Sequence, residues 1–96
     1  MVSEVLLGAR IRRLREARGM TRPDLAAAMW ALGVRIEASN ISRYEADFYE
    51  PKIRAFAALA RALGVTMEVL LYGEDEAARI ADERESAGDG TASAGG

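Results

Sequence analysis

The chain has 96 residues; half of them are apolar, two are prolines, and the formal net charge is −2. A chain of this length forms one small domain with a modest core. It contains neither cysteine nor histidine, which excludes disulfides and removes the usual zinc ligands and nucleophile–base pairs. We therefore expect no enzyme, no cofactor and no metal site. No apolar run approaches the ~20 residues that cross a bilayer, and no signal-peptide pattern opens the sequence, so we expect a cytoplasmic protein.

The net charge conceals an uneven distribution along the chain. Residues 1–73 carry 11 basic and 8 acidic side chains, a net charge of +3, whereas residues 74–96 carry 2 arginines and 7 acidic side chains, a net charge of −5. A mildly basic body followed by an acidic tail is compatible with nucleic-acid binding but is common in other proteins too. The chain is thus divided into a body, residues 1–73, and a tail, residues 74–96.

Two amphipathic helices are predicted in the first part of the body. The first spans residues 3–18, with Ser3 as its cap and Gly19 as its stop. Arginines surround its apolar stripe and are expected mostly on a solvated face; the stripe itself consists of Leu7, Ile11 and Leu14. The second helix begins at residues 21–24 (TRPD), a near capping box with an early proline. Its stripe ends before Gly33 and consists of Leu25, Met29 and Leu32, with Trp30 beside it as a partly buried packing residue.

A third helix, residues 38–47, has two different faces. Ile41, Tyr44 and Phe48 are spaced i, i+3 and i+7, which places them together toward the core. The polar residues point the other way: Ser39, Asn40 and Arg43. Such a face is suited to hydrogen bonds with base edges and phosphates. Val34 and Ile36 are expected as inward anchors of the preceding connection, and Pro51 disfavours helical geometry beyond residue 49.

Two further helices complete the predicted bundle. One spans residues 52–63 and ends at Gly64, and its core face consists of Ile53, Phe56, Leu59, Ala60 and Leu63. The other spans residues 67–72, with Thr66 as its cap and Gly73 as its stop. Residues 74–85 are charged and alanine-rich, which indicates a frayed helix, and residues 86–96 have the composition of a disordered segment. The expected fold is all-α, a compact five-helix bundle with a disordered acidic C-terminal tail.

Several segments together resemble the phage-repressor (Cro/CI, XRE-type) family of helix-turn-helix regulators. Residues 8–15 (GARIRRLR) resemble its opening helix, residues 21–26 (TRPDLA) its second helix and residues 41–45 (ISRYE) its recognition helix. Pro51 and residues 59–65 (LARALGV) are similar to its closing part. The resemblance covers residues 4–73, and it implies that the helix beginning near Ala38 enters the DNA major groove.

The resemblance also implies particular DNA contacts. The residues expected at base edges are Ala38, Ser39, Asn40 and Arg43, of which Arg43 is suited to a bidentate contact with guanine. The residues expected at phosphates are Arg22, Ser42, Tyr49 and Lys52. Three alternatives stay open: Arg43 pairs with Asp47 on the surface, Asn40 holds a phosphate instead of reading an adenine, and Tyr49 and Lys52 contact no DNA.

The separation of Leu25 and Ile41, 16 residues, is about five longer than in the compact form of the motif, so either the second helix is longer or the turn is a loop. Acidic residues at positions 37, 47 and 50 flank the third helix and would repel phosphate, which favours a homodimer on two half-sites of double-stranded DNA.

The function expected is a sequence-specific transcriptional regulator, a repressor. The alternative is a protein-interaction module, of the antitoxin or anti-repressor type, that binds a protein partner through the acidic tail.

Overall fold

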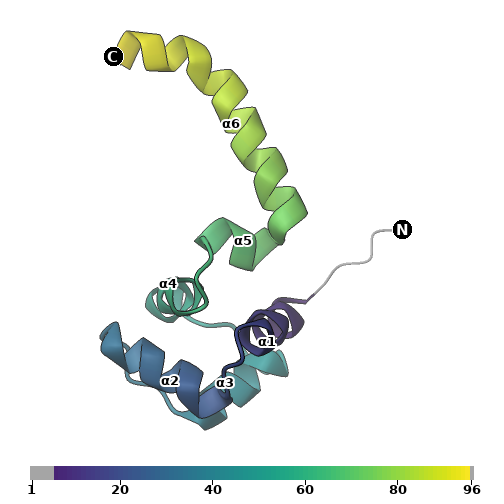
Figure 1. The fold of residues 1–96 in the computed structure, drawn as a ribbon, viewed down its shortest axis with the longest axis vertical. Coiled ribbons are helices and arrows are strands. Elements are labelled where there is room, and N and C mark those ends of the chain that lie inside the picture. The colour runs from purple at the N-terminus through teal and green to yellow at the C-terminus, as the bar shows by residue number, and fades with distance from the viewer. Residues whose placement is uncertain (1–5, 96) are drawn as a thin grey trace.

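The computed structural model of the chain describes residues 6–95, and side chains through residue 85. Its regular structure over that range is entirely helical: α1 (Leu7–Ala17), α2 (Arg22–Ala31), α3 (Ala38–Glu45), α4 (Ile53–Ala62), α5 (Met67–Tyr72) and α6 (Glu74–Gly95). The first five helices gather into a bundle, from which α6 extends outward (Figure 1). The all-α class and the five-helix body are therefore confirmed.

The ends of α2 and α5 follow from local capping chemistry. The Thr21 hydroxyl accepts a hydrogen bond from the Asp24 N–H at 3.1 Å, and the Asp24 carboxylate accepts one from the Thr21 N–H at 2.9 Å. This second bond holds the pKa of Asp24 below its usual value. The Thr66 hydroxyl likewise accepts from the Val69 N–H at 3.0 Å, and α5 ends at Gly73, whose φ of 91° suits glycine. Both predicted caps are confirmed, whereas Ser3 lies outside the described residues.

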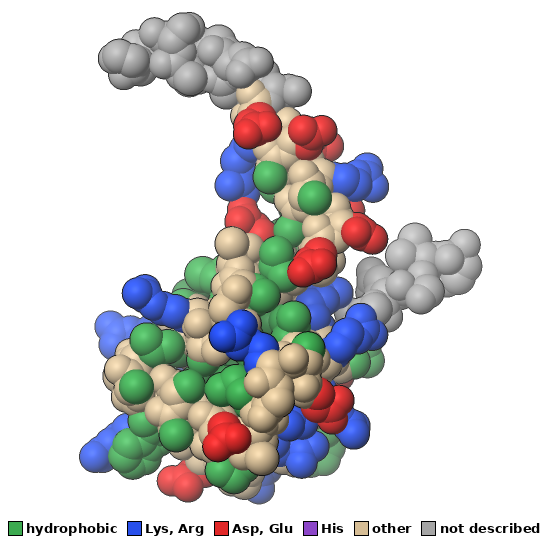
Figure 2. All heavy atoms as spheres, viewed as in Figure 1, with side chains coloured by type: hydrophobic (Ala, Val, Ile, Leu, Met, Phe, Trp, Pro, Cys, Tyr) green, Lys and Arg blue, Asp and Glu red, His purple; other side chains and the backbone are tan. Residues whose placement is uncertain are grey.

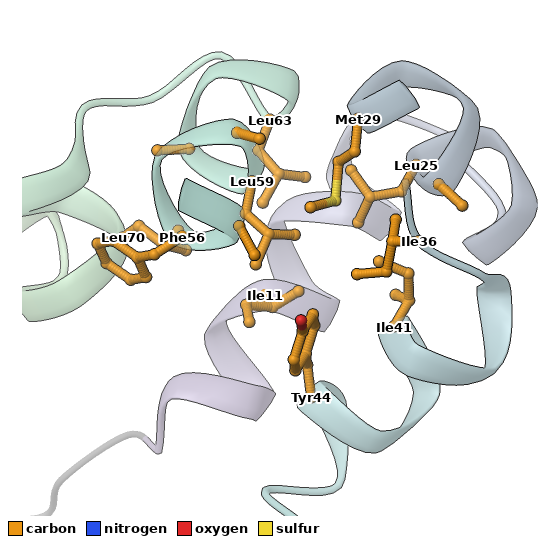
Figure 3. Close-up of a cluster of buried hydrophobic side chains, with 14 residues drawn as sticks. Ile11, Leu25, Met29, Ile36, Ile41, Tyr44, Phe56, Leu59, Leu63 and Leu70 are labelled. Atoms are coloured by element: carbon orange, nitrogen blue, oxygen red, sulfur yellow. The ribbon is translucent and has the colours of Figure 1, made fainter. Parts of the chain in front are cut away.

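The core lies where α1, α2, α3 and α4 meet (Figure 3). Its fully buried side chains come from five helices: Ile11, Leu25, Met29, Ile41, Leu59, Leu63 and Leu70. Burial of one such side chain contributes about 1.5–3 kcal/mol of transfer free energy. Ile36 is also buried and Val34 packs against the cluster, so the predicted anchors of the connection before α3 are confirmed.

Two aromatic or aliphatic residues predicted in the core lie on the surface instead. The side chain of Phe48 is 75% exposed and that of Ile53 is 72% exposed. Helix α3 ends at Glu45, and the chain then turns through Asp47 at a φ of 59°. Phe48 therefore leaves the helical period that Ile41 and Tyr44 follow. Ile53 is the first residue of α4, and the helix begins to bury side chains only at its third residue.

The connection between α2 and α3 is a loop. Helix α2 ends at Ala31, and residues 32–37 link it to α3. This loop accounts for the long spacing between Leu25 and Ile41, and α2 itself is not extended. Leu32, predicted on the apolar stripe, is the first residue after α2 and is 40% exposed.

Beyond Gly73 the described chain continues as α6, which begins where the sequence predicted a frayed helix. Alanine has the highest intrinsic helix propensity and recurs through this region. Helix α6 contacts α5, and Arg84 forms an ion pair with Glu68 between the two helices. None of the described helices combines the length and the apolar character that a membrane crossing requires.

Gly8 lets α1 approach the end of α3 closely. A Cβ atom at this position would lie 2.4 Å from the Glu45 carbonyl oxygen and 2.5 Å from that of Tyr44. The Gly8 N–H also donates to an Asp47 carboxylate oxygen at 3.0 Å. The start of α1 is thus fixed directly on the backbone of α3.

Gly8→Ala is expected to lower the free energy of unfolding by about 1–3 kcal/mol, because the helices must separate to admit the methyl group. In an open helix the same change would raise stability by up to ~1 kcal/mol through helix propensity. Urea denaturation followed by circular dichroism gives the sign of the change in the free energy of unfolding. A variant more stable than the native chain would contradict the close contact between α1 and α3.

Candidate nucleic-acid interface

Helix α3 turns one face to the core and the other to solvent. Ile41 is fully buried and Tyr44 is 8% exposed, and in Figure 3 both point into the apolar cluster. Ser39, Ser42 and Arg43, which follow i, i+3 and i+4 spacing, are exposed. The predicted core face is therefore confirmed for Ile41 and Tyr44 but not for Phe48, and Asn40, predicted on the polar face, is partly buried.

Arg43 is available for a ligand. It forms no ion pair with any side chain among residues 6–85, and the alternative of a surface pair with Asp47 is not realised. Asp47 instead accepts the hydrogen bond from Gly8. Arg43 is thus an exposed residue of α3 without an ion-pair partner among residues 6–85.

Asn40 and Tyr49 are bonded to each other and to the start of α3. The Asn40 Oδ1 accepts from the Glu37 N–H at 3.0 Å, which caps the helix, and its Nδ2 donates to the Tyr49 hydroxyl at 3.0 Å. The Tyr49 ring lies edge-on to Tyr44, with ring centroids 5.4 Å apart. Since Tyr49 accepts in this bond, its own hydroxyl proton remains free to bind a phosphate oxygen. Asn40 would have to give up a cap contact to read a base.

A buried ion cluster fixes α3 against α1 and α2. Arg15 donates to both carboxylate oxygens of Glu45, at 2.6 and 3.2 Å, and to the Met20 carbonyl oxygen at 2.8 Å. Arg22 donates to the same carboxylate at 3.0 Å. The side chains of Arg15 and Glu45 are only 8% and 4% exposed. The hydrogen bond to Glu45 raises the pKa of Arg15 above its ordinary value, so the arginine stays charged.

This ion cluster was not predicted from the sequence, because the arginines of the first helix, Arg15 among them, were expected mostly on a solvated face. The signal was its spacing: Gly8, Ile11 and Arg15 follow i, i+3 and i+7 and all three are buried. A charged residue on a buried stripe calls for a buried partner of opposite charge. Glu45 is this partner, and it lies in the segment that was predicted to recognise DNA.

The residues expected at phosphates occupy three places around α3. Arg22 stands at the start of α2, and its bond to Glu45 uses Nε and leaves the side chain 41% exposed. Ser42 lies on the exposed face of α3. Tyr49 and Lys52 line one depression together with Asn40, and Lys52 precedes α4. Ala38, the first residue of α3, is partly buried. The DNA contacts of these residues stay predictions.

Charge is distributed as the sequence indicated. Figure 2 shows basic side chains spread over the bundle and several acidic ones along α6. Among the described residues, no group of three or more acidic, histidine or cysteine side chains is placed to hold a metal ion. The chemistry offered at α3 is therefore hydrogen bonding and positive charge.

Residues 6–71 match the family described as the helix-turn-helix domain, which is more than half of the chain. The chain belongs to the helix-turn-helix domain family. Among solved structures, this domain is similar to the P22 c2 repressor protein in complex with synthetic operator 9T in the presence of Tl⁺. The two are 27% identical with a TM-score of 0.66, and the match covers 74% of this chain and 100% of that chain. Comparison with curated proteins gives no match. The predicted phage-repressor type of helix-turn-helix fold is confirmed.

In this helix-turn-helix domain, the turn between the two helices of the motif is the loop of residues 32–37. Trp30 secures it, since its Nε1 donates to the Ile36 carbonyl oxygen at 2.7 Å. The guanidinium of Arg35 lies over the Trp30 ring, 5.0 Å from its centroid. The loop is therefore held in one conformation immediately before α3 begins.

Proposed function

We propose that this helix-turn-helix domain is a transcriptional regulator, a repressor, that binds operator DNA as a homodimer with α3 in the major groove. The observation that carries the proposal is the exposed face of Ser39, Ser42 and Arg43 on a helix fixed by buried contacts. Base edges in the major groove present the acceptors that such donors bind. The similar P22 c2 repressor was solved with a synthetic operator, which supports the same ligand class for this chain.

The decisive experiment is selection of bound duplexes from a random DNA pool, followed by gel-shift titration of selected and scrambled sequences over a range of salt concentrations. A regulator should enrich a two-fold symmetric site, and its affinity should fall steeply as salt rises because phosphate contacts release counterions. An affinity that depends on neither sequence nor salt would exclude this function.

The homodimer is supported by three exposed apolar side chains, which lie just before α1, just after α3 and at the first residue of α4: Leu6, Phe48 and Ile53. These three side chains are 60%, 75% and 72% exposed. Leu6 and Phe48 lie on neighbouring segments, because the N–H of Gly8 is bonded to Asp47. Apolar side chains this exposed mark contact sites when they gather on one surface.

Phe48→Ser is expected to weaken dimerisation by roughly 5- to 30-fold, which corresponds to about 1–2 kcal/mol for an aromatic residue at an interface. The folded monomer should be unaffected, since the ring is 75% exposed. Sedimentation equilibrium measures the change. Leu71→Ser, which alters an exposed residue of α5, is the control; if it dissociates the dimer and Phe48→Ser does not, the interface lies on α5.

The second candidate function is a module that binds a protein partner through α6. The observation in its favour is an acidic helix that leaves the bundle and contacts α5 (Figure 1). A solubilising tail explains the same composition without a partner, so this candidate ranks second.

Deletion of residues 74–96 separates the two functions. It removes a net charge of −5, so a DNA-binding body should stay folded and bind duplexes modestly more tightly because repulsion from phosphate falls. Gel-shift titration and thermal denaturation of the truncated and full chains give the result. Loss of folding or of a dimer on truncation would instead make α6 a structural element.

A further inference from the structure

The loop of residues 32–37 contributes a cation, Arg35, which lies outside both helices of the motif and shortly before α3. Arg35 is exposed and its guanidinium lies over the Trp30 ring. A cation at this position is attracted by the ring quadrupole, and stacking orients the planar fork. The Trp30 ring is itself fixed by the bond from its Nε1 to the Ile36 carbonyl oxygen at 2.7 Å.

Arg35 also shares a depression with residues already expected at DNA phosphates. The depression is lined, among others, by Arg35, Asn40, Tyr49, Glu50 and Lys52. The depression is thus lined by two basic residues, Arg35 and Lys52, by Tyr49 and by one acidic residue, Glu50. The Tyr49 hydroxyl accepts from Asn40 and can donate outward. This combination of donors favours a singly charged phosphodiester.

We infer that Arg35, Lys52 and the Tyr49 hydroxyl form a phosphate clamp for the DNA backbone beside α3, with Trp30 as the residue that positions Arg35. The inference rests on the proposed DNA-binding function and assigns a purpose to the loop that lengthens the motif. The clamp holds the duplex by charge and reads no base. It sets the depth at which the start of α3 meets the groove, because the loop ends at the cap of that helix.

The test measures the salt dependence of binding to the selected duplex and to a scrambled duplex of equal length. Removal of one phosphate contact weakens binding equally for both duplexes and lowers the slope of log affinity against log salt by about one. Arg35→Ala should show both effects in the full chain. Arg79→Ala is the matched control, because it removes the same charge from an exposed side chain of α6 and should leave the slope unchanged.

Trp30 is tested through its dependence on Arg35. Trp30→Ala should lower the slope in the native background and have no further effect on it once Arg35 is alanine, whereas Trp30→Phe, which keeps an aromatic face, should retain most of the slope. Thermal denaturation checks that each variant is folded. An unchanged slope in Arg35→Ala, with sequence preference intact, overturns the clamp and leaves the regulator standing; failure of the native chain to bind either duplex overturns both.

Discussion

Replacing Glu45 with glutamine is expected to lower the free energy of unfolding by about 3–5 kcal/mol, since it leaves the buried Arg15 with only the exposed carboxylate of Glu16, 3.9 Å away, as a counter-charge. Both side chains are less than one tenth exposed, so water cannot replace the lost partner. The change also removes the anchor of Arg22. Three helices lose a common point of attachment at once. Urea denaturation followed by circular dichroism measures the effect.

Glu16→Gln is the matched control for this prediction. Glu16 pairs with Arg12 at 3.0 Å, where the two side chains are 54% and 60% exposed, and it lies 3.9 Å from Arg15, a longer contact than the 2.6 Å between Arg15 and Glu45. An exposed i, i+4 pair contributes little to stability, because solvent screens both charges. Equal losses in the two variants would show that the ion cluster around Glu45 does not hold the fold. A partial recovery of stability in the double variant Arg15→Met, Glu45→Leu would show that the cost comes from the unpaired charge.

Arg43→Ala is expected to abolish most of the preference for the selected site over a scrambled duplex. A bidentate contact between arginine and guanine contributes about 1–3 kcal/mol of discrimination, or roughly 5- to 150-fold in affinity ratio. Because Arg43 is exposed and forms no ion pair within residues 6–85, the protein should remain folded. Competition gel shifts with both duplexes measure the ratio.

Two further variants show whether the sequence preference depends on the planar geometry of the Arg43 guanidinium or only on its charge. Arg43→Lys keeps the charge but lacks the planar fork, so affinity for the scrambled duplex should persist while the preference is lost. Arg12→Ala, on the exposed side of α1, should weaken both duplexes alike or not at all. If Arg43→Ala preserved the full preference, α3 would read DNA through other residues or would not read it.

Local chemistry explains why much of this fold could be predicted from the sequence. Thr21, Thr66 and Gly73 act through bonds to residues at most four positions away or through their own φ, and each was located correctly. The stripes of Ile11 and Leu59 follow the same logic, since a helix places i and i+4 on one face.

The errors came where a helix ended early or where charge was buried. Phe48 was placed by extending the period of α3 past Glu45, but the positive φ of Asp47 interrupts that period. Arg15 was assigned to solvent because arginine is rarely buried without a partner, and its partner is 30 positions away in the chain. Contacts over such distances are set by the packing of helices and are invisible to local spacing.

The candidate DNA-binding site was predicted only in part, again because local spacing does not reveal contacts between residues distant in the sequence. The polar face of α3 follows from spacing, so Ser39 and Arg43 were correctly predicted to be exposed, whereas Asn40, predicted on the same face, is partly buried. The use of Asn40 as a cap, and its bond to Tyr49, depend on how the chain turns after Asp47. Arg35 was overlooked because nothing in the sequence joins it to Trp30.

Because the Arg15–Glu45 pair is buried, added salt should affect DNA binding more strongly than it affects the packing of α3. At physiological salt the Debye length is about 8 Å, which screens contacts between exposed arginines and phosphate but acts much less on charges enclosed by protein. Added salt should therefore release DNA from a domain whose α3 is still in its native position. A salt titration of DNA affinity then measures the electrostatic contacts between protein and DNA, because α3 stays folded over the same salt range.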